Sequence, residues 1–554
     1  MLSRKKLLLI LRILLWLLPA ICLTAAIVVD RYFSQKQDFA EANLALVGGD
    51  LHAAGSTYRR LAKSFWWGEN AKAGMAIVRA LTDSSFNEPG EIRPDALRSF
   101  PIDLLLFKAV EGRKFEACLR LADFQKLVLP TSRSDLFRIL ALLELERFGE
   151  ADRIFMSLSA KDRDSWLGRR LGSVKNHLKE SAATLIYDRL GLLIGRIDGE
   201  GSMHPGDGIN LNLIPSPVIE DALKNGGKRG IRVSLDLDLT RIAYEALEGY
   251  RGSIVFLDPD SGEVLAAVSD ERTLRTTGVP AFVQLREPAS ISKLITTTAA
   301  MRAGYDPDAE IAEMTCEGAK EYRGGILYCA YRAGPLQSLD RAMAVSCNIA
   351  FANLGVRIGE EALVNELRRY GFDRSSESGF RFGSILRRTR NDRDIADLSI
   401  GIEMSEMTPL HGALIAAIFA TGGKQPEPFF LHAIDGFTGL SPIKIKQGPG
   451  KTVITPEMAR VGKQSMLAVT GFGGTGYNLA PDGLSFAMKT GTASDGRTGY
   501  HTNYIGFFPA SEPRVAFCVR VTHQRTSSRV RRATIDVMRK LLAGVHELSK
   551  SRRL

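Results

Sequence analysis

The sequence predicts an α+β protein, in which an antiparallel sheet carries an inserted helical lobe and follows an N-terminal helical region. Three observations support this prediction. Apolar residues recur with helical spacing over residues 34–198, and helices dominate again over 290–422. Strand patterns occupy 231–269 and return from residue 485 onward. A stretch rich in Gly, Pro and Asn at 199–230 separates the two parts of the chain.

The N-terminus has the pattern of a membrane anchor. Residues 1–6 are basic, and residues 7–29 are apolar except for Arg12. The uninterrupted part, 13–29, has 17 residues, which is at the short end for a helix that spans a bilayer. The positive flank predicts a cytoplasmic N-terminus and an external location for the rest of the chain. A cleaved signal peptide is the alternative.

The helical region, 30–200, contains a weak repeat. A bulky residue followed three places later by a small one recurs at the start of three helical patterns, at intervals of 64 and 33 residues. These intervals are near two tetratricopeptide periods and one. The pairs are Leu51 with Ala54, Phe115 with Cys118, and Phe148 with Ala151. A solenoid that docks peptides or proteins and a simple helical spacer both remain open.

Composition narrows the class of protein. The 554 residues are enough for two or more domains, and 45% hydrophobic with 24% charged residues is typical of a folded protein. Much of the net charge of +11 lies in the tail 514–554. This tail either attracts anionic lipids or wall polymers or forms a solvated helix face. No motif supports binding to nucleic acid.

Two cysteines flank a short Gly-rich segment. An exported compartment would permit a disulfide between Cys316 and Cys329. A zinc site is less favoured because no Cys-x-x-Cys pair or nearby His completes a ligand set. Cys118, Cys347 and Cys518 fit buried thiols. These cysteines therefore favour no zinc site.

The predicted order begins with a basic tail (1–6), an apolar helix (7–29) and the helical region (30–200). A linker (201–229) and an α+β domain (230–548) follow. In the α+β domain we expect a strand at 231–237, a helix at 239–247 and a hairpin at 253–269. Three further strands and a basic amphipathic helix are expected at 485–492, 503–508, 515–521 and 530–548.

Ser290 and Lys293 form the first candidate motif. On a helix their side chains share one face, and Pro288 suits a helix that begins near Ser290. Backbone N–H groups would then favour negative charge at the serine oxygen. A serine nucleophile needs a base, and a lysine can act as one only when burial or positive charge, here Lys489, lowers its pKa. A coincidental pair on an exposed helix is the alternative.

Ser346, Cys347 and Asn348 interrupt an apolar run. In a loop, the first and third side chains point the same way. Ser346 could then pass a proton to a leaving amine, and Asn348 could hold an amide through its donor and its acceptor. The alternative is a turn or helix start that Ser346 caps.

The third motif, residues 489–493, lies on an expected strand. Alternation places Lys489 and Gly491 on one face, and Thr490 and Thr492 on the other. The ammonium and the hydroxyls could bind a terminal carboxylate. Gly491 lets another chain approach the backbone closely, and the N–H groups of Thr492 and Ser290 could form an oxyanion hole. An ordinary edge strand is the alternative.

In this order the three motifs resemble those of penicillin-binding proteins and serine β-lactamases. The flanking sequences are similar to the transpeptidase domain of penicillin-binding proteins, and the resemblance covers about residues 230–545. The similar segments are 234–239, 257–266, 287–293, 407–411, 420–424 and 503–509.

This resemblance implies a transpeptidase/β-lactamase-like fold and a DD-transpeptidase of peptidoglycan in the bacterial cytoplasmic (inner) membrane. Ser290 would attack the penultimate D-Ala carbonyl of a stem peptide, with Lys293 as base and Ser346 as proton relay. Asn348, Lys489, Thr490, Gly491 and Thr492 would bind substrate. Penicillins would acylate Ser290, and no metal or organic cofactor is implied. The implied partners are stem peptides, β-lactams, the membrane and, through residues 30–200, other wall-synthesis proteins.

The departures from the family pattern leave alternatives. Cys347 stands where the β-lactamase form has Asp, and its side chain is expected to point away from substrate. Residues 30–200 carry no glycosyltransferase-like motif, so we expect no glycan polymerisation. The alternatives are a β-lactamase, which would need a base such as Glu361 near Asn365, a DD-carboxypeptidase, a β-lactam sensor, and a non-catalytic wall-synthesis scaffold.

Overall fold

A computed structural model describes most of the chain and divides it into two compact units. The first unit comprises residues 1–183, 198–200 and 435–442, and the second comprises 184–197, 201–434 and 443–554. The described residues are 4–86, 92–178, 184–198, 202–206, 219, 230–270, 280–377, 379–440, 442–445, 447–448, 450–494 and 499–551, without the side chains of 4–22, 176–178, 280 and 523.

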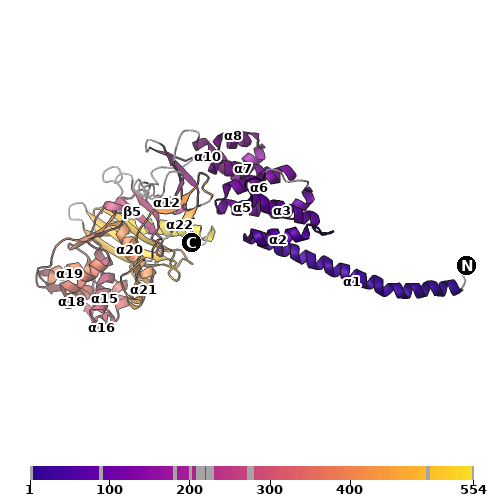
Figure 1. The fold of residues 1–554 in the computed structure, drawn as a ribbon. Coiled ribbons are helices and arrows are strands. Elements are labelled where there is room, and N and C mark those ends of the chain that lie inside the picture. Colours follow the sequence, from indigo (N-terminus) through magenta and orange to yellow (C-terminus); the bar gives the residue numbers. More distant parts are fainter. Residues whose placement is uncertain are drawn as a thin grey trace. The chain divides into compact units, whose positions relative to one another are not determined.

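The first unit is built from helices, and most of them pack against the next helix along the chain (Figure 1). It contains α1 (Arg4–Gly48), α2 (Leu51–Leu61), α3 (Gly68–Thr82), α4 (Pro94–Leu97), α5 (Ile102–Glu111), α6 (Phe115–Val128), α7 (Ser132–Glu144), α8 (Phe148–Ser157), α9 (Ala160–Arg163) and α10 (Trp166–Leu178).

The recurring sequence pattern marks helix starts. Its three bulky residues are the first residues of α2, α6 and α8. The small residues that follow, Ala54, Cys118 and Ala151, have no exposed surface. Small side chains at these buried positions let neighbouring helices approach closely. The pattern is thus explained by packing, whereas a docking role for this unit stays a prediction.

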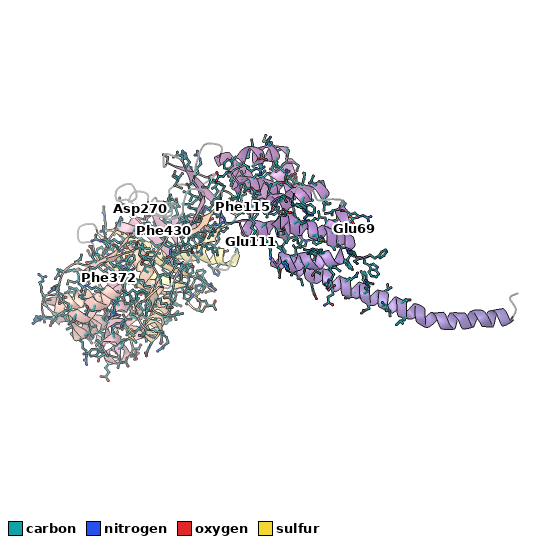
Figure 2. The ribbon with its side chains drawn as sticks, viewed as in Figure 1. Glu69, Glu111, Phe115, Asp270, Phe372 and Phe430 are labelled. Atoms are coloured by element: carbon teal, nitrogen blue, oxygen red, sulfur yellow. The ribbon has the colours of Figure 1, made fainter. Side chains whose placement is uncertain are left out.

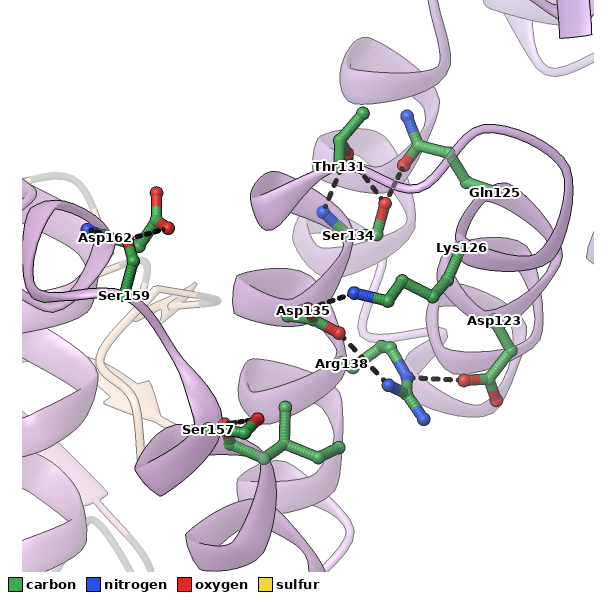
Figure 3. A network of polar contacts seen from close by, with 11 residues as sticks. Asp123, Gln125, Lys126, Thr131, Ser134, Asp135, Arg138, Ser157, Ser159 and Asp162 are labelled. Atoms are coloured by element: carbon green, nitrogen blue, oxygen red, sulfur yellow. Dashed lines mark hydrogen bonds and ion pairs between the residues drawn. The ribbon is translucent and has the colours of Figure 1, made fainter.

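Helices α6 and α7 are joined by polar contacts as well as by apolar packing (Figure 3). Lys126 bonds Asp135 at 2.5 Å, and Arg138 bonds both Asp135 at 3.1 Å and Asp123 at 2.5 Å. Lys126 therefore has a carboxylate partner on the facing helix, and Arg138 has one on the facing helix and one on its own helix.

The predicted membrane segment falls within α1. Most of it lies among residues whose side chains are outside the described part of the chain. Among the residues that are described, no helix combines the length and the apolar character needed to cross a membrane.

The second unit is built on a five-stranded antiparallel sheet in the order β18-β19-β20-β5-β6. Its strands are β5 (Gly252–Leu257), β6 (Val264–Ser269), β18 (Ala487–Ser494), β19 (Tyr500–Phe508) and β20 (Val515–Gln524). Strands from the two ends of the domain thus meet where β20 pairs with β5. Helices α12 (Leu237–Leu247) and α22 (Ser527–Ser551) pack against each other and the sheet, and α20 (Pro409–Ala420) packs on β5, β19 and β20.

The helical lobe is inserted between β6 and β18, which confirms the predicted fold class. Its main helices are α15 (Ser292–Arg302), α16 (Pro307–Ala312), α17 (Leu339–Ala344), α18 (Asn348–Arg369), α19 (Asp392–Ile400) and α21 (Pro456–Thr470). Helix α15 packs against α18 and α19. Phe372 and Phe430, labelled in Figure 2, are buried in the core of this unit.

Smaller sheets accompany the main one. A six-stranded sheet has the order β16-β15-β4-β1-β2-β3, with β1 (Thr184–Tyr187), β2 (Leu193–Ile197), β3 (Met203–Pro205), β4 (Gly230–Val233), β15 (Leu431–Asp435) and β16 (Ile443–Lys444). Strands β1 and β2 thus lie inside the range 30–200 that we expected to be helical. Strand β1 pairs in parallel with β4, far along the chain, and local sequence does not show such a pairing. The expected linker, 201–229, lies mostly outside the described residues.

Candidate active site

Ser290 lies in a short 3-10 turn, Ala289–Ile291, directly before α15. The helix that the sequence predicts near Ser290 thus begins two residues later, at Ser292. Ala289 has a φ of 53°, a conformation that is costly for a residue with a side chain. The turn presents Ser290 as a half-buried residue at the N-terminal end of α15.

Strand β19 and the segment before α20 hold the chain that leads to Ser290. Asn503 Nδ2 donates to the Glu287 carbonyl at 2.8 Å, and the Ala289 N–H donates to the Gly401 carbonyl at 2.8 Å. Arg520 is fully buried and orients Asn503 by donating to its Oδ1 at 2.7 Å. These contacts explain how the turn before Ser290 keeps its strained geometry.

Lys293 is the second residue of α15, three residues after Ser290, and is completely buried. Its Nζ donates to the Ser346 carbonyl at 2.7 Å, to Ser346 Oγ at 3.1 Å and to Asn348 Oδ1 at 2.8 Å. The lysine of the first motif is therefore bonded directly to both polar side chains of the second motif.

Burial controls the protonation of this lysine. It lowers the pKa of Lys293 to about 8, against a partial opposing effect of three nearby cysteines. A neutral amine keeps two N–H groups, which suffice for the Ser346 carbonyl and Asn348 Oδ1. Its lone pair is then available to accept a proton from a hydroxyl. The site can therefore hold an amine that acts as a base near neutral pH.

Ser346 lies in the loop between α17 and α18 with a φ of 54°. Cys347 is the N-cap residue of α18, and Asn348 is its first residue. Asn348 Nδ2 donates to the Tyr328 carbonyl at 2.8 Å, so both ends of this amide are held in place. The loop conformation brings Ser346 and Asn348 to the same lysine.

Strand β18 supplies the third motif. Lys489 is fully buried, and its Nζ donates to Ser346 Oγ at 3.1 Å and to the Thr490 carbonyl at 2.8 Å. Burial holds the pKa of Lys489 well below its ordinary value, and the charge of Lys293 lowers it further. The Ser346 hydroxyl thus lies between two lysines, one from each of the other motifs.

Gly491 lies where β18 passes the Ser290 turn. A Cβ atom there would come within 2.9 Å of the Pro288 carbonyl oxygen and 3.3 Å of the Ser290 nitrogen. The segment that comes close to this glycine is the nucleophile segment of the same chain, whereas the approach of another chain stays a prediction. Next along the strand, Thr492 is half-buried opposite Thr502 of β19. Its share in an oxyanion hole with Ser290 stays a prediction.

Some residues at the site escaped the sequence reasoning. Thr475 Oγ1 lies 2.7 Å from Thr490 Oγ1, and Thr475 belongs to a loop with no motif of its own. The sequence indicates Asn503 only as part of a flanking segment, and the buried Arg520 not at all. An arginine in an otherwise apolar strand pattern such as 515–521 was the one available signal for a buried polar contact.

Cys347, Cys316 and Cys329 meet beside this site. All three are free thiols, and their sulfur atoms lie within 4.8 Å of one another. The disulfide that the sequence left open is thus not formed here, and the third sulfur comes from the second motif. Sequence spacing could not show this arrangement, because it depends on how the chain between Cys329 and Cys347 folds back. Among the described residues this is the one cluster of at least three Cys, His or acidic groups with metal-ligand geometry.

Comparison with known proteins places the chain in a family. The penicillin binding protein transpeptidase domain matches residues 252–543, which is more than half of the chain. The chain belongs to this family. The match includes all three motifs described above.

Curated relatives and solved structures agree with this assignment. The chain is 30% identical over 308 residues to the peptidoglycan D,D-transpeptidase PbpA of Mycolicibacterium smegmatis, covering 49% of this chain and 62% of the relative. It is 25% identical over 372 residues to a probable peptidoglycan D,D-transpeptidase, PenA, of Neisseria meningitidis, covering 62% of this chain and 58% of that relative. The chain thus spans less than two thirds of the length of these relatives.

The fold is also that of solved transpeptidase structures. The D,D-transpeptidase domain of a peptidoglycan glycosyltransferase from Eggerthella lenta aligns with a TM-score of 0.57 at 19% identity, covering 67% of this chain and 100% of that one. A ceftriaxone acyl-enzyme complex of penicillin-binding protein A from M. tuberculosis aligns with a TM-score of 0.54 at 21% identity, covering 65% of this chain and 98% of that one.

Proposed function

We propose that this chain is a serine-type peptidoglycan D,D-transpeptidase that cross-links stem peptides through an acyl-enzyme and binds penicillins covalently. The observation that carries the proposal is the position of the Ser346 hydroxyl, which lies 3.1 Å from both Lys293 Nζ and Lys489 Nζ. Three motifs that are far apart in the sequence meet at this atom, and Lys293, three residues after the half-buried Ser290, is one of its two lysine partners.

The first step forms an ester at Ser290. The neutral amine of Lys293 takes the proton from the Ser290 hydroxyl while its oxygen attacks the penultimate D-Ala carbonyl. Backbone N–H groups of Ser290 and Thr492 stabilise the resulting oxyanion. The Ser346 hydroxyl passes the proton to the leaving amine, and the terminal D-Ala departs.

Substrate binding falls to the other motif residues. Asn348 holds a substrate amide, while Lys489, Thr490 and Thr492 bind the terminal carboxylate, with Gly491 keeping β18 close to the nucleophile. The amine of a second stem peptide then attacks the ester, which restores Ser290 and forms the cross-link. No step requires a metal or an organic cofactor.

Labelling with a fluorescent penicillin, followed by mapping of the modified peptide, tests this proposal. We expect a stable adduct on Ser290, and no labelling of a Ser290→Ala variant. Ser441→Ala is the matched control because residues 441 and 444 repeat the Ser-x-x-Lys spacing. An adduct on another residue, or none on the wild-type chain, would refute the proposal.

Product analysis separates transpeptidation from its alternatives. A stem pentapeptide with an acceptor amine should yield cross-linked product along with free D-Ala, whereas a carboxypeptidase would release D-Ala without cross-linking. Rapid turnover of β-lactam would indicate a β-lactamase. Against that alternative, Glu361 is exposed on helix α18 instead of facing the site from a loop.

We further propose that residues 7–29 anchor the protein in the bacterial inner membrane, with both units outside the cytoplasm, and that the helical unit binds wall-synthesis proteins. The apolar sequence of 7–29 supports the first part. Exposed aromatic residues on the helical unit, such as Phe65 at 92% and Trp166 at 64%, support the second. Deletion of residues 1–29 should release the protein from membranes without loss of penicillin binding.

A further inference from the structure

Exposed aromatic side chains gather at one place on the helical unit, where the loop between α2 and α3 lies against α1. Phe65 is 92% exposed and Trp66 36%, and Phe33 of α1 is 59% exposed. The ring centroid of Trp66 lies 5.8 Å from those of Phe65 and Tyr32. The Tyr32 ring in turn lies 5.5 Å from that of Phe33. We call these four residues, Tyr32, Phe33, Phe65 and Trp66, the aromatic patch.

Specific contacts orient the loop of this patch. Ser64 Oγ donates to Gln35 Oε1 of α1 at 2.6 Å. It also accepts the N–H groups of Trp66 at 3.3 Å and Trp67 at 3.2 Å. The Trp67 ring stacks on the buried Phe39, with 5.1 Å between the centroids. The loop therefore packs through one of its aromatic rings and presents the aromatic patch outward, which leaves apolar surface in water. A partner that covered the patch would recover the free energy of burying that surface.

The aromatic patch lies directly beyond the apolar segment 7–29. Helix α1 runs from Arg4 to Gly48, and its N-terminal part extends away from the other helices of this unit (Figure 1). At about 1.5 Å per residue, Phe33 lies about 6 Å beyond Val29 along the helix axis. The headgroup layer on each side of a bilayer is about 5–8 Å thick. If residues 7–29 span the hydrocarbon core, the patch therefore falls within the headgroup layer.

The exposed surface of α1 supports the same position. Four apolar residues that precede the patch are each at least 50% exposed: Leu23, Ile27, Val28 and Val29. Between them and Tyr32 lie only Asp30 and Arg31, whose charges suit the headgroup layer better than the hydrocarbon core. Exposed apolar surface thus leads from the apolar segment to the patch.

We propose that the aromatic patch is a membrane-contact site that inserts into the lipid headgroup layer beside α1. Trp and Tyr rings favour this layer because it accommodates an apolar ring together with an N–H or O–H group. The depth of insertion rests on the anchor proposed above, whereas lipid binding by the patch does not. A second point of contact would keep the helical unit from turning about α1, and so fix which of its faces points away from the membrane.

Exposed aromatic residues suit protein partners as well as lipids, and the helical unit has a second site of this kind. Trp166 lies on α10, which packs against α7, α8 and α9, and the Arg170 guanidinium covers its ring at 5.8 Å from the centroid. Phe65, by contrast, lies beside the end of the apolar segment. Position therefore favours lipid for the aromatic patch and leaves Trp166 for a protein partner.

Fluorescence quenching on the full-length chain, in vesicles of phosphatidylethanolamine and phosphatidylglycerol, tests this proposal. Lipids brominated near the headgroups or near the bilayer centre quench tryptophans at the same depth. The difference between wild type and Trp66→Phe isolates Trp66, and we expect shallow bromines to quench it at least about twice as strongly as deep ones. Trp16, within 7–29, is isolated in the same way through Trp16→Phe and should respond more to deep bromines.

A matched pair of variants tests the role of the patch. Phe65→Ser should reduce the shallow quenching of Trp66 by at least about half, with the thermal unfolding of the chain unchanged. Trp166→Ser removes another exposed aromatic residue of the same unit and should leave the quenching of Trp66 unaltered.

The outcomes separate the patch from the anchor. Quenching of Trp16 without quenching of Trp66 would overturn the proposal, as would a Trp66 that only a bound protein shields from acrylamide. Quenching of Trp66 without quenching of Trp16 would mean that the proposed anchor has failed and the patch has not. Quenching of neither would overturn both.

Discussion

The two units treat buried cations in opposite ways. In the helical unit, Lys175 has only 7% of its side chain exposed and bonds Asp152 at 2.6 Å. In the second unit, which we call the transpeptidase unit because it contains the matched residues 252–543, Lys293 is completely buried, and its Nζ donates to a carbonyl, a hydroxyl and an amide oxygen. A carboxylate stabilises the charged form of an amine, whereas neutral oxygens and burial allow the neutral form. The difference distinguishes a cation that stabilises a fold from one that can perform chemistry.

The largest expected effect comes from exchanging the two lysines for methionine. Lys293→Met should slow penicillin acylation by about 10³-fold, because the base is lost, with little loss of stability, since burying an amine is costly. Lys175→Met should leave acylation unchanged and destabilise the helical unit by about 2 kcal/mol, because Asp152 loses the cation that it bonds. Acylation rates and thermal unfolding of both variants measure this contrast. Equal effects of the two substitutions on acylation would contradict it.

Two arginines, one in each unit, extend the comparison of buried cations. Arg520 donates to Asn503 Oδ1, to the Gln284 carbonyl at 2.6 Å and to the Met407 carbonyl at 2.8 Å. A lysine cannot reproduce this planar set of donors, so Arg520→Lys should destabilise the transpeptidase unit by about 3 kcal/mol. Penicillin acylation should slow as well, because Asn503 holds the chain before Ser290.

Arg138 of the helical unit provides the matched control. It is partly exposed and bonds Asp123 and Asp135. A lysine can still pair with one carboxylate, so Arg138→Lys should cost less than about 1 kcal/mol and leave acylation unchanged. Denaturant unfolding of the two variants measures the difference, and a larger loss at Arg138 would show that the distinction between the units is wrong.

The protonation of Lys293 predicts how acylation depends on pH. With a pKa of about 8, roughly one amine in ten is neutral at pH 7, and almost all are neutral at pH 9. Acylation should therefore rise about tenfold between these values. Stability should rise with pH from about 8 to the ordinary lysine value, because the unfolded chain binds the extra proton there. Stopped-flow acylation from pH 6 to 10 measures the profile, and a rate that falls through pH 8 would exclude Lys293 as the base.

The sequence revealed the transpeptidase unit far better than the helical one. Ser290, Ser346 and Lys489 were recognisable because each lies in a short local motif, and the three motifs have a fixed order. The sequence patterns that predict the strands of the sheet and the helices of this unit were also strong. What the sequence missed depends on contacts between distant segments: the pairing of β1 with β4, the Thr475–Thr490 contact, and the meeting of Cys347 with Cys329. Periodicity carries no information on such contacts.

In the helical unit the same local reasoning found helix starts but no function. Leu51, Phe115 and Phe148 begin helices in which a small residue one turn later permits close packing. Many helical proteins meet that requirement, whether they bind a partner or not. A packing pattern therefore identifies architecture, whereas a set of reactive side chains in a fixed order identifies chemistry.

Substitutions at two glycines should have effects of opposite sign, and the one in the helical unit is among the smallest expected. Gly491→Ala places a methyl group 2.9 Å from the Pro288 carbonyl oxygen and should destabilise the transpeptidase unit by about 2 kcal/mol, with slower acylation as the Ser290 turn shifts. Gly149 lies inside α8, and an alanine Cβ at this position would have no neighbouring atom within 4 Å. Gly149→Ala should therefore stabilise the helical unit by about 0.5–1 kcal/mol. Thermal unfolding and acylation rates of the two variants measure both effects. If both substitutions stabilised the protein, β18 could not approach the nucleophile as closely as the active-site geometry requires.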